Sequence, residues 1–184
     1  MDDYSVVGLP VKSWDEYYYN VAIQTARNSK CLSRRIGAVL VRDKTIIGTG
    51  YNGPPRGVPH CSVRHRYDVS LLSEYKNIDK HFDKRVNVVK CPRQLLGYKS
   101  GEGLSWCPAG HSERNTLINS AREGISTKNA SLFLTCGIPC SACMVEIINA
   151  GVVEVVVVNM QYYDSTSKYL LENSGVKIRM YDFI

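Results

Sequence analysis

Two short segments of the sequence combine residue types that bind zinc. One is His111-Ser112-Glu113, and the other is Pro139-Cys140-Ser141-Ala142-Cys143. Two cysteines spaced C-x-x-C at a helix start converge on one tetrahedral ion, and a histidine supplies a third ligand. Three ligands leave a fourth position for water, whose pKa zinc lowers to about 7. The pattern predicts a catalytic zinc site with His111, Cys140 and Cys143 as its ligands.

Glu113 follows the histidine of this pattern by two residues. At a helix start, that offset places a carboxylate beside the fourth position without making it a ligand. Such a carboxylate can take a proton from water and pass it to a substrate. We therefore predict that Glu113 is a catalytic proton shuttle. An accidental C-x-x-C with an unrelated histidine is the alternative, and it does not account for the H-x-E offset or for Pro139.

The elements that must position these residues have an α/β pattern. Strand and helix signals alternate after residue 112, which indicates parallel strands, and an earlier hairpin closes the other end of the sheet. We expect a three-layer α/β/α sandwich around a mixed five-stranded sheet, preceded by a loose arm at 1–12. The expected helices span 13–28, 112–122, 140–150 and 165–173, and the expected strands span 36–41, 45–50, 131–135, 152–158 and 176–181.

The composition is that of one globular domain. The chain has 184 residues, of which 44% are hydrophobic and 22% are charged, which suits a single domain at 1–184. No apolar run approaches the roughly 20 residues of a membrane-spanning helix. Residues 58–106 are polar and are interpreted as an insertion whose apolar residues do not form a core. The acidic start Met1-Asp2-Asp3-Tyr4 lacks a signal-peptide pattern, so we expect a cytoplasmic protein.

The charge balance favours anionic ligands. Lys and Arg total 23 against 17 Asp and Glu, a net charge of +6. This excess suits phosphates, although a solvated basic surface explains it equally well. Acidic and basic residues are mixed through the insertion, so the basic stripe typical of nucleic-acid binding is not expected. The seven cysteines favour metal ligands or free thiols over disulfides in a reducing compartment.

Together these motifs resemble those of the zinc-dependent cytidine deaminase superfamily, and most closely the deoxycytidylate (dCMP) deaminases of bacterial and phage type. The resemblance runs from about Ser13 to Met180, and Ser112 departs from it because the family usually has Ala there. It implies a cytidine deaminase-like fold, one catalytic zinc, and hydrolysis of dCMP to dUMP and ammonia in pyrimidine deoxynucleotide metabolism. The segments that carry it are Ile36–Val41, Gly50–Gly53, Gly57–Cys61, H-x-E-x-N and P-C-x-x-C.

The resemblance also implies residues that bind the substrate. Asn52 would hydrogen-bond the sugar, and Ala38 would line the pocket for the base. Tyr163 would flank the substrate. Asn115 would contact the substrate or, alternatively, orient the loop that carries Asn52.

Phosphate and effector sites are implied in the same way. Arg35 is the candidate phosphate contact, with Arg34 and Arg56 as rivals, and each of them can equally be surface charge. Many dCMP deaminases are homohexamers that dCTP activates and dTTP inhibits, and a loop matching the glycine-rich one here contributes to their effector site. Gly53, Arg56 and Gly57 are therefore candidate effector-binding residues, unless this loop is an ordinary turn.

A second, structural zinc is a further implication. Some dCMP deaminases have ligands for it at the positions of Cys31 and Cys61, with another near Cys107. Cys91 would complete a closed four-cysteine site that pins the insertion. Alternatively, Cys31 is a small apolar residue of the core, and His60 or His65 of the insertion is the zinc ligand in its place.

Two other functions compete with dCMP deamination. The same chemistry can act on tRNA, single-stranded DNA or a modified cytosine nucleotide. Alternatively, the chain is a non-catalytic zinc module. Glu113 argues against such a module, because a purely structural zinc has no use for a proton shuttle.

Overall fold

The computed structural model describes residues 10–99 and 101–183, so most of the predicted N-terminal arm lies outside the described residues. Within these ranges, one mixed sheet has the strand order β2-β1-β3-β4-β5. Strand β1 pairs antiparallel with β2 and β3, whereas β3, β4 and β5 are parallel. The predicted mixed five-stranded sheet is therefore confirmed. Its strands are β1 (Gly37–Arg42), β2 (Thr45–Tyr51), β3 (Ser131–Leu134), β4 (Glu154–Val157) and β5 (Lys177–Met180).

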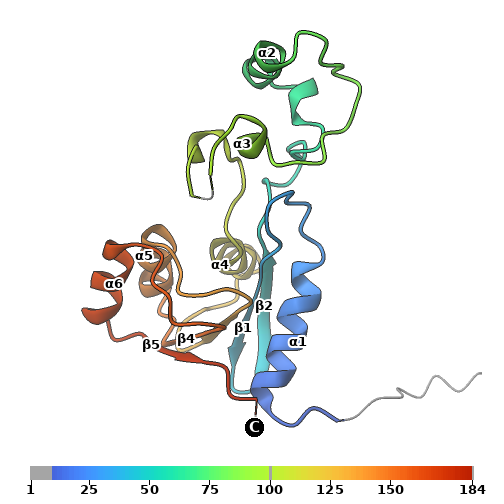
Figure 1. Ribbon diagram of the computed structural model, residues 1–184. Helices are drawn as coiled ribbons and strands as arrows, with labels where there is room; N and C mark the ends of the chain where they lie inside the picture. The colour runs from blue at the N-terminus through green and yellow to red at the C-terminus, as the bar shows by residue number, and fades with distance from the viewer. Residues whose placement is uncertain (1–9, 100, 184) are drawn as a thin grey trace, which may run out of the picture.

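Helices cover both faces of this sheet (Figure 1). Helix α1 packs on one face, and α4, α5 and α6 pack on the other, which confirms the three-layer sandwich. Helices α2 and α3 belong to the insertion. The helices are α1 (Trp14–Ala26), α2 (Val69–Ile78), α3 (Pro92–Leu95), α4 (Ser112–Arg122), α5 (Ser141–Asn149) and α6 (Ser165–Glu172), and 3₁₀ turns lie at Arg64–Arg66 and Leu104–Trp106.

Strand β1 shows how the sequence builds two cores at once. Its side chains alternate between the faces of the sheet, as extended backbone requires. Val39 packs in the cluster beneath α1, and Ala38 and Leu40 pack in the cluster beneath α4, α5 and α6. A Cβ atom on Gly37 would lie 2.1 Å from the carbonyl oxygen of Ala22 in α1. Glycine at this position therefore lets α1 approach the sheet closely.

The insertion stands beyond one end of the sandwich (Figure 1). Contrary to the prediction, it has a small core of its own, in which Leu71, Tyr75 and Val88 are buried against partly buried neighbours. The wholly buried ring of His65 packs on Tyr75 and Phe82. Helical periodicity does not reveal this core because its members come from several short segments. The partly buried neighbours are Leu32, Phe82, Leu95, Leu96 and Trp106.

No helix among the described residues is both long enough and apolar enough to cross a membrane.

Candidate active site

The three predicted zinc ligands meet where two helices begin. His111 is the N-cap residue of α4, Cys140 is the N-cap residue of α5, and Cys143 lies in the first turn of α5. The His111 Nδ1 atom is 3.5 Å from the Cys140 sulfur and 3.3 Å from the Cys143 sulfur. Among the His, Cys, Asp and Glu side chains of residues 10–99 and 101–183, these three form the one group that is close enough to share a metal ion. Their ligand atoms all lie within 4.8 Å of one another.

Hydrogen bonds within this trio shift the pKa values of its members in different directions. Hydrogen bonds from Cys143 and His111 lower the pKa of Cys140 to about 4, despite the opposing effect of burial. The pKa of Cys143 is raised because its thiol donates to Cys140 and is buried, and the bond to Cys140 raises the pKa of His111. The positive ends of two helix dipoles also favour thiolate here. One imidazole and two thiolates form a donor set that fits zinc and leaves one position open.

Glu113 lies beside this trio in the first turn of α4 and is only 5% exposed. The hydroxyl of the wholly buried Ser112 donates a hydrogen bond of 2.8 Å to its Oε2 atom. Ser112 thus holds one carboxylate oxygen in place. The sequence marks Ser112 only as a departure from the family pattern and does not reveal this contact.

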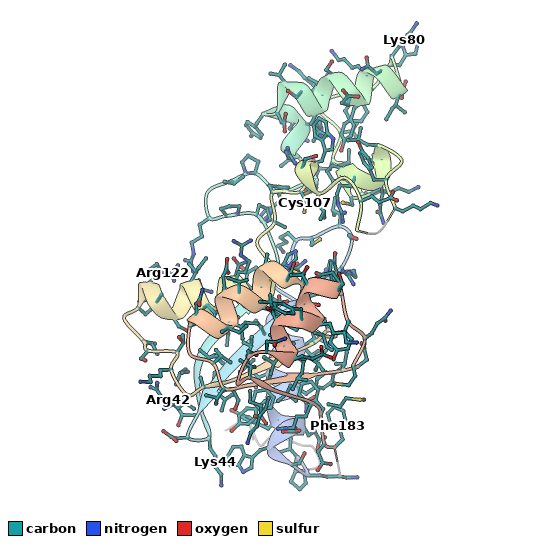
Figure 2. The ribbon with its side chains drawn as sticks, turned by 90° about the vertical axis from the view of Figure 1, so that its left-hand side faces the viewer. Arg42, Lys44, Lys80, Cys107, Arg122 and Phe183 are labelled. Atoms are coloured by element: carbon teal, nitrogen blue, oxygen red, sulfur yellow. The ribbon has the colours of Figure 1, made fainter. Side chains whose placement is uncertain are left out.

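A cavity of about 350 Å³ extends from the trio, and both the sandwich and the insertion contribute to its walls. This volume is in the range of small-molecule sites. Insertion residues that line it include Arg93 and Leu104. Cys107, which follows the insertion, also lines it, and Figure 2 shows Cys107 at the junction between the insertion and the sandwich. The insertion is therefore part of the site.

Asn52 and Tyr163 line this cavity, as a role in binding would require. The Asn52 amide nitrogen donates to the Arg34 carbonyl oxygen at 2.9 Å, and its Oδ1 accepts from the Ile36 backbone N–H at 2.8 Å. Because an amide has two donors and two lone pairs, one of each is left for a ligand. Tyr163 is about half exposed, and its neighbour Tyr162, which was not predicted, also lines the cavity.

Other predicted residues lie away from the cavity walls. Ala38 is fully buried in the core beneath α4. Arg35 does not line the cavity, whereas its predicted rival Arg34 does. Asn115 also lies outside the lining, and its amide donates to the Tyr51 carbonyl oxygen at 2.8 Å. This bond agrees with the alternative role for Asn115, which is to orient the adjacent loop.

The predicted effector residues lie in that loop. Gly53 pairs with Gly110 through two backbone hydrogen bonds of 3.1 and 2.9 Å, directly before the ligand His111. Gly57 has a φ of +78°, a conformation that favours glycine. Arg56 contacts Asn119 of α4 at 3.4 Å. The loop is thus tied to the zinc-binding segment.

The four cysteines of the predicted second zinc site share one region. All are free thiols, and burial together with the nearby Cys91, Cys107 and Cys31 raises the pKa of Cys61 to about 11. Within the described residues, their sulfur atoms are not as tightly gathered as those of the catalytic trio. A metal ion would have to draw them together. The alternative ligand His65 contacts the Lys84 carbonyl oxygen through Nε2.

The fold and the site define a class: an α/β/α domain with a zinc-binding trio at two helix N-termini and a buried glutamate beside it. The model of the cytidine and deoxycytidylate deaminase zinc-binding region matches residues 12–159. The chain belongs to this family.

Relatives and solved structures agree with this assignment. The chain is 33% identical to the deoxycytidylate deaminase of Mycobacterium phage D29 over 148 residues, 78% of this chain and 92% of the relative. It is 35% identical to the Schizosaccharomyces pombe deoxycytidylate deaminase over 92% of this chain but 44% of the relative, so it spans less than half of that protein. The dCMP deaminase of cyanophage S-TIM5, solved with dCMP and dUMP, has a similar fold, with a TM-score of 0.59 and 23% identity over 90% of this chain and 94% of its own.

Proposed function

We propose that the chain hydrolyses dCMP to dUMP and ammonia. The observation that carries this proposal is the buried carboxylate of Glu113 beside the trio of His111, Cys140 and Cys143 in a cavity of nucleotide size. Family membership and the name deoxycytidylate deaminase of the phage and yeast relatives support it.

The chain's own residues then have distinct tasks. His111, Cys140 and Cys143 would hold zinc, which supplies the Lewis acid that activates water at neutral pH. The carboxylate of Glu113 would take one proton from the attacking water and pass it to the ring nitrogen beside the reacting carbon. It would then take the second proton, from the hydroxyl that the water leaves on that carbon, and pass it to the amine, which departs as ammonia. The hydroxyl of Ser112 holds one oxygen of this carboxylate by a hydrogen bond. From the cavity walls, Asn52 holds the sugar and Tyr163 flanks the substrate.

A substrate panel tests this proposal. Turnover of zinc-loaded protein is followed by ultraviolet absorbance with dCMP, deoxycytidine, CMP and dCTP. We expect the cytosine absorbance to be lost faster with dCMP than with any of the other three. Activity with none of them, from protein shown to contain zinc, would reject dCMP deamination and leave a polynucleotide or a modified base as the substrate.

We also propose that Cys31, Cys61, Cys91 and Cys107 hold a second, structural zinc. Their common region supports this, because Cys91, Cys107 and Cys31 all lie close enough to Cys61 to raise its pKa, and one zinc ion would neutralise the thiolates gathered there. Elemental analysis should give two zinc per chain, and one in Cys61→Ser and in Cys107→Ser. A value of one in the unaltered protein would contradict the second site.

We further propose regulation by dCTP and dTTP in a homohexamer in the cytoplasm. The bridge between Gly53 and Gly110 supports coupling, because a nucleotide on the loop with Arg56 and Gly57 would act on the segment before His111. The seven free cysteines suit a reducing compartment. Light scattering should give six chains per particle. In rate measurements, dCTP should lower the dCMP concentration that gives the half-maximal rate, and dTTP should raise it. A monomer whose rate ignores both nucleotides would contradict this.

A further inference from the structure

Arg93 of α3 lines the active-site cavity from the insertion. Its Nη1 atom donates to the carbonyl oxygen of Glu102. Its Nε atom is buried and has no hydrogen-bond partner among the described residues. A buried N–H group without an acceptor is unfavourable, and more so when it belongs to a charged group. An anionic oxygen in the cavity would offset the positive charge of this guanidinium.

A second guanidinium, that of Arg34, lines the same cavity from the sandwich. The side chain of Asn52 holds the Arg34 carbonyl oxygen and so fixes the backbone here. The positive charge of Arg34 also opposes the rise that burial causes in the pKa of Cys136, another cavity residue. Two cations from distant parts of the chain therefore border one cavity.

The charges of the cavity are unbalanced. Among its described lining residues, Glu113 is the one carboxylate, and it lies beside the zinc ligands. Neither Arg34 nor Arg93 forms an ion pair in the part of the chain that the structure describes. A doubly charged phosphate matches this excess, because guanidinium groups form strong, charge-assisted hydrogen bonds with phosphate oxygens.

We propose that Arg93 selects the 5′-monophosphate of the substrate, with Arg34 as the second cation for the same group. This inference rests on the proposed function. The phosphate oxygens accept hydrogen bonds from the guanidinium of Arg93, which the bond from its Nη1 atom to the Glu102 carbonyl oxygen holds in place. A nucleoside without phosphate does not form these hydrogen bonds and binds more weakly. The insertion is then a specificity element as well as a wall of the site.

The test compares dCMP with deoxycytidine in the zinc-loaded, full-length protein. Arg93→Gln should lower the ratio of the two kcat/KM values about 10- to 100-fold, almost entirely through dCMP. Arg93→Lys keeps the positive charge and should lower this ratio less than Arg93→Gln does. Arg85→Gln is the matched control, since Arg85 lies in the same insertion and its exposed side chain pairs with Asp83. It should leave the ratio unchanged.

The outcomes separate the two proposals. If the unaltered protein does not favour dCMP over deoxycytidine, the proposed function and the role of Arg93 both fall. If it favours dCMP and Arg93→Gln keeps that preference, only the role of Arg93 falls. A folded Arg93→Gln that loses both substrates equally would assign Arg93 a structural role and overturn the inference. Calorimetry with dUMP and deoxyuridine should show the same selective loss in binding.

Discussion

At the scale of single residues, the contact between Ser112 and Glu113 distinguishes this site. The hydroxyl of Ser112 holds Oε2 of the glutamate, and both residues are buried beside the zinc ligands. A proton shuttle must be oriented in order to serve both water and substrate. We therefore infer that Ser112 contributes to turnover without touching the substrate's reacting atoms.

The variant Ser112→Ala tests this contribution. It removes one hydrogen bond to a charged group, which is worth about 1.5 kcal/mol. We expect kcat for dCMP to fall about tenfold, with unchanged zinc content and little change in KM. Ser120→Ala is the control, because this buried serine of α4 donates to the Thr116 carbonyl oxygen and not to Glu113, and it should leave kcat unaltered. An unchanged kcat in Ser112→Ala would show that the hydrogen bond does not orient the glutamate.

At the scale of elements, the site depends on two helix starts that the sheet places side by side. Strand β3 leads into α5, which supplies Cys140 and Cys143, and α4 begins at His111. Both helix N-termini are positive, and they favour the deprotonated ligands that zinc needs. Metal binding and protonation must therefore compete at this point.

The zinc affinity of the trio should depend on pH. Cys143 and His111, whose pKa values are raised, hold protons that zinc must displace, whereas Cys140, with a pKa of about 4, is already a thiolate. With at least one proton displaced, affinity should fall about tenfold or more for each unit that the pH decreases below 7. Chelator competition measures this, and Cys140→Ser gives the background from other sites. A pH-independent affinity would contradict the assignment.

These elements also show what the sequence could predict. The meeting of the three zinc ligands could be predicted from the sequence, and so could the place of Glu113 beside them, because each motif is local and its spacing dictates convergence at a helix start. The place of Arg93 at the cavity could not be predicted, because it depends on how the insertion packs. The core of the insertion joins Leu32, Leu71 and Trp106 from distant segments, and no periodic pattern connects them. Long-range packing of this kind leaves no local signal.

At the scale of the whole molecule, an ion-pair network joins the first helix to the last strands. Asp15 of α1 accepts hydrogen bonds from Arg179 of β5 and from the backbone N–H of Asp182, and Arg179 also donates to Glu154 of β4. Burial raises the pKa of Asp15, but these hydrogen bonds and the charge of Arg179 together lower it below its usual value. The network fastens α1 to the far edge of the sheet.

Asp15→Asn should therefore destabilise the fold. We expect the free energy of unfolding at pH 7 to fall by about 1–3 kcal/mol. Because the folded pKa is lowered, the contribution is complete above the unfolded pKa of about 3.9 and declines as pH falls toward the folded pKa. Urea unfolding at several pH values measures both effects. Glu123→Gln, which removes the exposed pair with Arg122, is the control and should change stability by less than about 0.5 kcal/mol.

Glu113 would perform the proton transfers of the proposed zinc-dependent dCMP hydrolysis. The most direct test is Glu113→Gln, which keeps the size of the side chain and removes its ability to accept a proton. We expect kcat for dCMP to fall about 10²- to 10⁴-fold, while zinc content and dUMP binding persist. Turnover near that of the unaltered protein, with zinc still bound, would contradict the mechanism.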